Sequence, residues 1–256
     1  MTHIIALTNQ KGGVGKTTTA VNLAAAFGAL KKRALLVDLD PQGNATTGSG
    51  ADKHDLAAGS VLDVLLGEAQ AKDVIVECDE AGYSLLPGNA DLTAAEVSLL
   101  DMDERDRQLA ESLAPVKDRF DVILIDCPPS LNMLTVNALT ASDGVIIPLQ
   151  CEFYALEGLS ALLDTIDQVR DSINPALAIY GILRTMYDNR ISLTRDVSKQ
   201  LLDYFGDDLL KSVIPRNIRL AEAPSHGLPV NKYARMSRGS HAYRVLAKEL
   251  IKRLAL

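Results

Sequence analysis

The sequence predicts an α/β fold: a single domain over residues 1–256, built on one doubly wound, mostly parallel sheet with helices on both faces. Three observations lead to this prediction. Short β-like runs alternate along the chain with longer helix-like stretches. The short runs are continuously apolar, as in parallel strands that are covered on both faces. The chain also has no internal repeat, low-complexity tract or Pro/Gly-rich linker that would divide it.

The expected strands are the apolar runs themselves, such as IIALT at the start of the chain. In order they are 4–8, 34–39, 84–87, 122–126, 144–149, 178–184 and 212–214. The longer stretches between them predict helices at 16–30, 92–100, 105–117, 134–140, 156–172, 194–205 and 240–256. Ligands of such sheets bind beyond the carboxyl ends of strands, so the residues that follow each strand are the first candidates for a site. The segment 51–110 carries no motif that points to a function.

Composition excludes several classes of protein. Hydrophobic residues make up 47% of the 256 residues and charged residues 23%, which excludes disordered and fibrous chains. No uncharged apolar run approaches the roughly 18 residues of a membrane-spanning helix, and the run at 4–7 is too short for a signal peptide. Cys78, Cys127 and Cys151 form no C-x-x-C pair, which argues against disulfides, zinc and most iron–sulfur clusters. We therefore expect a cytoplasmic protein.

Charge is distributed unevenly along the chain. The formal net charge is −7, but residues 1–183 carry 12 Lys/Arg against 26 Asp/Glu, whereas residues 184–256 carry 14 against 7. This asymmetry favours nucleic-acid phosphates as a partner of 184–256, with ordinary helix-surface charge as the alternative. Eight of its arginines are candidates for such contacts: Arg184, Arg190, Arg195, Arg216, Arg219, Arg235, Arg238 and Arg244. No helix-turn-helix or aromatic stacking platform accompanies them, so we expect non-specific contact with the DNA backbone.

A glycine-rich loop, QKGGVGKTT at 10–18, lies between the first expected strand and the first expected helix. Glycines let successive backbone N–H groups point at phosphate oxygens, and the helix adds its positive N-terminal end. In this pattern Lys16 reaches the β and γ phosphates, and the Thr17 hydroxyl ligates Mg²⁺. Gln10 replaces the usual first glycine and Lys11 is an additional cation; an ordinary Gly-rich turn is the alternative. The nucleotide-binding residues predicted from this loop are Lys11, Gly12, Gly13, Val14, Gly15, Lys16, Thr17 and Thr18.

Three aspartates stand where expected strands end. Asp38 and Asp40 follow the second strand, where a period of two puts both carboxylates on one side. A carboxylate in this place can position water for attack on a γ-phosphate, because phosphoryl transfer needs mainly positioning and charge stabilisation. Asp126 ends the run 122–125, and its carboxylate is expected to hold Mg²⁺ through water. Solvated acids and a structural cap are the alternatives, and the neighbouring Cys127 is expected to pack as a small apolar side chain.

Several motifs together resemble one family. KGGVGKTT at 11–18 is the deviant Walker A motif of the ParA/MinD group of ATPases, and VDLDPQGN at 37–44, IDCPPS at 125–130 and ALEGL at 155–159 are shared widely in that group. IPRN at 214–217 and EAPSHG at 222–227 are more particular to its ParA/Soj-type partitioning branch. The resemblance covers nearly the whole chain. It implies a P-loop NTPase fold of the deviant Walker A type, with ATP and Mg²⁺ as cofactors.

The resemblance also implies roles at the phosphates. Asp40 would orient the attacking water, so the expected catalytic residues are Lys11, Lys16 and Asp40. The expected metal site is Thr17, Asp38 and Asp126, with Asp38 near the water shell of the metal. Lys11 would contact the nucleotide of the partner in a face-to-face homodimer that forms on ATP binding, so hydrolysis would depend on dimer formation. The alternative for Lys11 is a solvated charge.

Base and DNA contacts are implied in the same way. The adenine pocket would be lined by Met186, Asp188, Pro215 and Asn217, and no Asn-Lys-x-Asp segment typical of guanine-specific proteins occurs. Arg190 and Arg219 match residues that bind double-stranded DNA without sequence preference. A ParB/Spo0J-like centromere-binding protein would stimulate hydrolysis and release the dimer from DNA. These relations imply a nucleoid-associated protein that segregates a chromosome or plasmid.

Three other functions compete with DNA segregation. A membrane-associated positioning ATPase of the MinD type would use the basic amphipathic helix expected at 240–256. We expect that helix to pack on the core, since it lacks bulky aromatic anchors, and so expect no membrane partner. An electron-transfer P-loop protein would need cysteines in paired or Gly-flanked motifs, and a bacterial tyrosine kinase would need a C-terminal tyrosine cluster. The sequence has neither feature.

Overall fold

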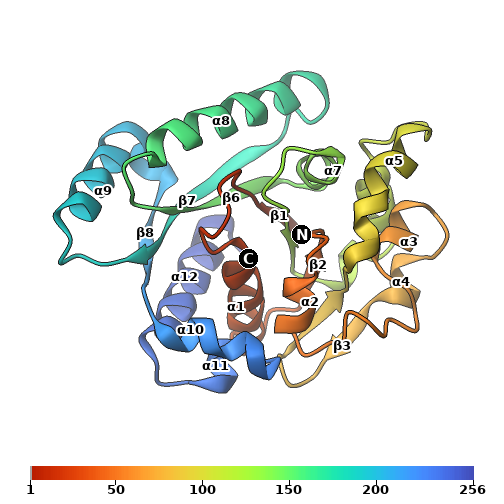
Figure 1. Ribbon diagram of the computed structural model, residues 1–256, viewed down its shortest axis with the longest axis horizontal. Helices are drawn as coiled ribbons and strands as arrows, with labels where there is room; N and C mark the ends of the chain where they lie inside the picture. The colour runs from red at the N-terminus through yellow and green to blue at the C-terminus, as the bar shows by residue number, and fades with distance from the viewer. Residues whose placement is uncertain (1) are drawn as a thin grey trace.

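The sheet of the computed structural model, which describes residues 2–256, has eight strands in the order β3-β4-β2-β5-β1-β6-β7-β8 (Figure 1). The strands are β1 (His3–Leu7), β2 (Ala34–Asp38), β3 (Val76–Cys78), β4 (Tyr83–Leu86), β5 (Val122–Asp126), β6 (Gly144–Gln150), β7 (Ala178–Tyr187) and β8 (Leu209–Pro215). Every neighbouring pair is parallel except β3 and β4, which are antiparallel. The expected α/β fold with a mostly parallel sheet is therefore confirmed.

Helices cover both faces of this sheet. One layer consists of α1 (Lys16–Ala29), α2 (Asn44–Gly48), α10 (Ile218–Glu222), α11 (Val230–Tyr233) and α12 (Arg238–Leu254). The other consists of α3 (Val61–Leu65), α4 (Ala71–Val74), α5 (Ala95–Leu100), α6 (Gln108–Leu113), α7 (Met133–Ala141), α8 (Ala155–Ser172) and α9 (Ser192–Phe205). In Figure 1 these two layers lie on opposite sides of the strands. The fold is thus doubly wound, as expected.

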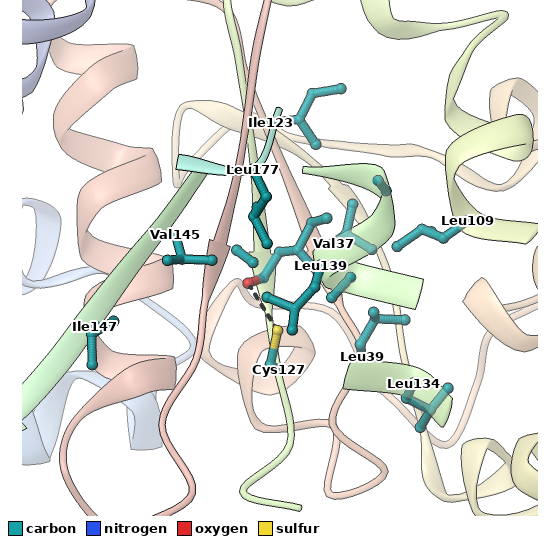
Figure 2. Close-up of a cluster of buried hydrophobic side chains, with 14 of the residues drawn as sticks. Val37, Leu39, Leu109, Ile123, Cys127, Leu134, Leu139, Val145, Ile147 and Leu177 are labelled. Atoms are coloured by element: carbon teal, nitrogen blue, oxygen red, sulfur yellow. Dashed lines mark hydrogen bonds between the residues drawn. The ribbon is translucent and has the colours of Figure 1, made fainter. Parts of the chain in front are cut away.

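The hydrophobic core explains why the strands are apolar along their whole length. Side chains alternate across a strand, so Ile123 and Ile125 of β5 enter one layer and Val122 and Leu124 the other. Figure 2 shows the first of these two layers, where Cys127 packs among apolar side chains and its Sγ donates to the Ile125 carbonyl at 3.8 Å. The expectation that Cys127 packs as a small apolar residue is confirmed, and burial raises the pKa of its thiol.

Several short elements were missed by the sequence analysis. They are β3, α2, α3, α4, α10 and α11, each of only three to five residues. Two expected helices are also shorter than predicted, because 92–100 begins as a 3₁₀ helix before α5, and 105–117 contains only α6. Conversely, β7 continues beyond 184 to Tyr187. Among residues 2–256, no helix combines the length and apolar character that a membrane crossing requires.

Candidate nucleotide site

The glycine-rich loop lies between β1 and α1, at the carboxyl end of the central strand (Figure 1). Gly13 and Gly15 have φ angles of 75° and 89°, in the left-handed region that favours glycine. No side chain caps the N-terminus of α1, whose N-cap residue is Gly15. The first backbone N–H groups of α1 therefore point into the loop, as a phosphate site requires.

Two side chains outside the glycine motif fix the shape of this loop. The Asn9 side chain accepts from the Lys11 backbone N–H at 2.9 Å and donates to the Pro148 carbonyl at 2.8 Å. The Thr185 hydroxyl donates to the Val14 carbonyl at 2.7 Å. These bonds attach the loop to β6 and β7. Neither role is evident from the sequence, although Asn9 directly precedes the motif.

Lys16 is buried at the start of α1. Its Nζ donates to the Lys11 carbonyl across the loop at 3.4 Å. Burial lowers the pKa of Lys16, and the nearby charges of Asp126 and Asp40 oppose that shift. The ammonium group is thus held inside the loop, close to the strand-end carboxylates. This is the place that the sequence predicts for a phosphate-binding lysine.

Sheet register places two aspartates side by side. Asp38 at the end of β2 is aligned with Asp126 at the end of β5, and neighbouring strands lie about 4.8 Å apart. Asp38 accepts from the Thr46 backbone N–H at 2.7 Å, from the Thr46 hydroxyl at 2.8 Å and from the Asp40 N–H at 3.3 Å. Burial raises the pKa of Asp38 to about 7 against these hydrogen bonds. Asp38 therefore holds α2 against the end of the sheet.

Asp126 has no such partners. Both its carboxylate oxygens are buried and make no hydrogen bond within residues 2–256. Burial, and then repulsion by Asp38, raises the pKa of Asp126 well above its usual range, although the nearby Thr17 hydroxyl and Lys16 ammonium act in the opposite direction. A buried carboxylate without a partner is costly, and a Mg²⁺ ion with its water shell would supply one. The Asp126 carboxylate therefore fits a magnesium site. The ion would need phosphate or water oxygens as further ligands, since the described chain has no cluster of three His, Cys, Asp or Glu suited to a metal.

Asp40 and Lys11 lie near the same end of the sheet. Asp40 is buried, and its carboxylate accepts from the Gln42 backbone N–H at 2.9 Å. Lys11 is exposed and pairs with Glu152, which follows β6, at 2.6 Å. Glu152 lies in no motif, so the sequence did not point to it. The roles predicted for Asp40 in orienting water and for Lys11 across a dimer interface stay predictions.

A cavity of about 360 Å³ lies beside the loop, which is large enough for a small ligand. It is bordered by the start of α1, the ends of β7 and β8, and α10. Its lining includes the predicted residues Met186, Pro215 and Asn217. Asp188, the fourth predicted pocket residue, is not part of this lining. Met186 has a φ of 48°, which is a strained conformation for this residue, and such strained residues cluster at functional sites.

Both candidate DNA-binding arginines are exposed, and each has an acidic neighbour. The side chain of Arg190 is 86% exposed and pairs with Asp188 at 2.6 Å, which lowers the pKa of that carboxyl to about 2. The side chain of Arg219 is 53% exposed and pairs with Glu222 at 2.7 Å. Arg184 differs from them, because it donates to the Ser198 hydroxyl and the Leu210 carbonyl. Arg184 therefore joins β7 to α9 and β8, and we do not include it among the arginines proposed to bind DNA phosphates.

The C-terminal helix α12 is packed on the core. Tyr243, Leu246 and Leu250 are buried, and the Tyr243 hydroxyl lies 3.2 Å from that of Thr19 on α1. The expectation of a core-packed last helix is confirmed. The apolar face that a membrane-bound helix would use is therefore covered by the protein itself.

Similarity to known proteins agrees with this site. Residues 2–179 match a family described as an AAA domain. The chain is 50% identical over 250 residues to the sporulation initiation inhibitor protein Soj of Bacillus subtilis, covering 98% of each chain. It is 47% identical over 254 residues to the chromosome-partitioning ATPase Soj of Treponema pallidum, covering 99% of this chain and 98% of that one.

A solved structure is also similar over nearly its whole length. It is titled cobyrinic acid a,c-diamide synthase of Mycobacterium smegmatis, with bound ADP and magnesium. The TM-score is 0.87 with 41% identity, and the match covers 100% of this chain and 96% of that one. The chain therefore belongs to the AAA-domain family and, within it, to the ParA/Soj branch of the deviant Walker A ATPases.

Proposed function

We propose that this protein is a DNA-segregation ATPase with ATP and Mg²⁺ as cofactors. Its ATP-bound homodimer binds double-stranded DNA without sequence preference, and a ParB/Spo0J-like partner stimulates hydrolysis and release. The protein is then cytoplasmic and associated with the nucleoid. Such a cycle is a switch, because hydrolysis moves the population between two states that differ in DNA affinity.

The observation that carries this proposal is the position of Asn217. Asn217 lines the 360 Å³ cavity, and its side chain also accepts from the Arg219 backbone N–H at 2.8 Å, which caps α10. On β7, the strand beside β8, Met186 also lines the cavity, and Arg190 follows it four residues later in the chain. Nucleotide contacts in the cavity would therefore act directly on the segments that carry both arginines.

The chemistry follows from the residues at the end of the sheet. Mg²⁺-bound ATP supplies the γ-phosphoryl group, and its transfer needs positioning and charge stabilisation. Lys16 and the loop N–H groups would bind the phosphates, and Thr17, Asp38 and Asp126 would hold the magnesium ion, directly or through water. Asp40 orients the water. Lys11 leaves Glu152 and contacts the nucleotide of the second protomer, which joins hydrolysis to dimer formation.

Sedimentation of an Asp40→Ala protein tests this function. The protein is spun with non-specific duplex DNA and, separately, with anionic liposomes, each with ATP, ADP or no nucleotide, at low and moderate salt. We expect binding to DNA that requires ATP and weakens with salt, without binding to liposomes. Asp103→Ala, at an exposed position far along the chain, is the matched control and should hydrolyse ATP normally.

Binding to liposomes in place of DNA would contradict the proposed function. ATP-dependent binding to liposomes without DNA would assign the protein to membrane positioning, although the apolar face of α12 is buried. Normal turnover by Asp40→Ala would remove Asp40 from the mechanism. In the same assay, Lys11→Ala should bind nucleotide and hydrolyse it poorly, and unimpaired partner-stimulated turnover would contradict the cross-dimer role.

A further inference from the structure

A second cavity, of about 530 Å³, lies at the edge of the sheet, away from the nucleotide site. It is enclosed between the loop 49–59 and the segment 76–80, which contains β3 and the turn after it. Pro87 and Gly227 complete its lining. We call this site the β3 groove. Its apolar lining residues are Ala51, Leu56, Ala57, Ala58, Val76 and Pro87.

The β3 groove borders a free edge of the sheet. β3 is the last strand in the sheet order, and within residues 2–256 its one partner strand is β4, in an antiparallel pairing from Val76↔Leu85 to Cys78↔Tyr83. An edge strand offers backbone N–H and C=O groups to an additional strand. Extended peptides bind in this way, with main-chain bonds along the edge and side chains in adjacent pockets.

The charge of the β3 groove restricts what can bind there. Its lining contains five acidic residues and no lysine or arginine. The five are Asp52, Asp55, Glu77, Asp79 and Glu80, and none forms an ion pair with another part of the described chain. Lys53 lies in the same loop, but its Nζ is bound to the Gln42 carbonyl at 2.6 Å. The basic residues 31–33 line an adjacent cavity that shares Glu77, Cys78 and Asp79 with the β3 groove, but within the described residues they form no ion pair with these acids, and Arg33 pairs with Asp121 instead.

The thiol of Cys78 shows the effect of this negative field. Burial, followed by the charges of Glu77 and Asp79, raises the pKa of Cys78 to about 11. A second copy of this chain at the same edge would bring like charges together, and an acidic peptide would be repelled for the same reason. A basic segment is the occupant that matches the groove.

The β3 groove also borders two loops that are close in sequence to the functional regions. Gly50 and Gly227 line it and approach so closely that a Cβ on Gly50 would lie 3.0 Å from the Gly227 carbonyl oxygen. Gly50 follows α2, whose Thr46 holds Asp38, and Gly227 follows the segment that begins after Arg219. An occupant would thus contact loops that lead to the nucleotide site and to Arg219.

We propose that the β3 groove binds an extended, basic peptide segment of a partner protein. The peptide backbone pairs with the free edge of β3, an apolar side chain enters between Leu56 and Val76, and flanking lysines or arginines meet the five acids. This inference does not rest on the proposed segregation function, and its test uses neither nucleotide nor DNA.

The test uses the capped hexapeptide Lys-Val-Lys-Val-Lys-Val as the probe and the acidic analogue Glu-Val-Glu-Val-Glu-Val as its control. Titration of the ¹⁵N-labelled full chain should show saturable binding of the basic probe, with amide shifts confined to 49–59 and 76–87. Affinity should fall with salt and should drop at least about tenfold in Asp79→Lys/Glu80→Lys, because two attractive charges become repulsive. The matched control Asp101→Lys/Asp103→Lys, at exposed positions outside the groove, should bind like the original protein.

A second variant avoids dependence on charge. Ala58→Trp places a large side chain at an exposed position of the groove and should also reduce binding. The proposal is overturned if the basic probe does not saturate, if the acidic probe binds equally, or if the shifts lie elsewhere. The protein could also form dimers without nucleotide whose stability changes in Asp79→Lys/Glu80→Lys. That result would assign the edge of β3 to a second copy of this chain and would equally overturn the proposal.

Discussion

Two regions of the molecule hold their charges in opposite ways. At the end of the sheet, Lys16 and Asp126 are buried, and Asp126 has no hydrogen-bond partner in the described chain. On the arginine surface, Arg190 and Arg219 are exposed, and each pairs with an acid a few residues away. A buried carboxyl group without a hydrogen-bond partner is costly, whereas an exposed ion pair contributes little. Asp126 by itself therefore indicates a missing ligand. Arg190 and Arg219 indicate a DNA partner only because their segments border the nucleotide cavity.

The largest effect is expected from Lys16→Ala. Loss of the buried ammonium leaves the phosphate charges without their main partner, so affinity for Mg²⁺-ATP should fall at least about a hundredfold. Titration with a fluorescent ATP analogue measures this change. Lys32→Ala, in the turn that follows α1, is the control. Tight ATP binding by Lys16→Ala would refute the assignment of the loop.

A smaller effect is expected on the arginine surface. Arg219→Glu should weaken binding of the ATP state to DNA about tenfold or more and lower the salt dependence by about one phosphate contact. The ATP-bound dimer should remain, which light scattering can verify. Arg107→Glu, an exposed residue outside the basic segment, is the matched control. Unchanged DNA affinity in Arg219→Glu would move the binding surface elsewhere.

The buried carboxylates make a prediction about pH. The raised pKa values of Asp38, to about 7, and of Asp126 mean that the folded protein keeps protons that the unfolded chain has already lost. The free energy of unfolding of the ligand-free protein should therefore fall as pH rises from about 4 to 7, by up to about 1.4 kcal/mol per pH unit for each proton. Asp126→Asn should flatten this slope in urea denaturation, and Asp103→Asn should not. Equal slopes in all three proteins would contradict the pKa directions.

The smallest effect is expected at Glu222, the acidic partner of the exposed Arg219. Glu222 accepts from Arg219 and from the Tyr233 hydroxyl, at 2.7 and 3.2 Å. Glu222→Gln removes a charge that competes with DNA phosphate, so DNA affinity at low salt should rise, by about fivefold at most, since exposed ion pairs contribute about 0–1 kcal/mol. Glu157→Gln on α8 is the control. Weaker DNA binding by Glu222→Gln would show that Glu222 positions Arg219 for DNA.

Much of the candidate site could be predicted because it depends on residues adjacent in sequence. The loop 10–18 carries its own conformation in its glycines, and Asp38 and Asp126 end apolar runs that are unmistakable strands. The short helices between 44 and 74 were missed because four or five residues are too few to show a helical period. The α3 helix still has a local signal, a capping box formed by Ser60 and Asp63.

The sequence by itself determined the α/β class, the phosphate loop and the strand-end acids, because continuous apolar runs and glycine spacing are local properties. Tertiary structure alone decided that Asp38 stands beside Asp126, that Lys11 pairs with Glu152, and that the face of α12 is covered. These contacts join residues far apart in the chain. They depend on strand order, register and helix packing, which no local pattern of residues specifies.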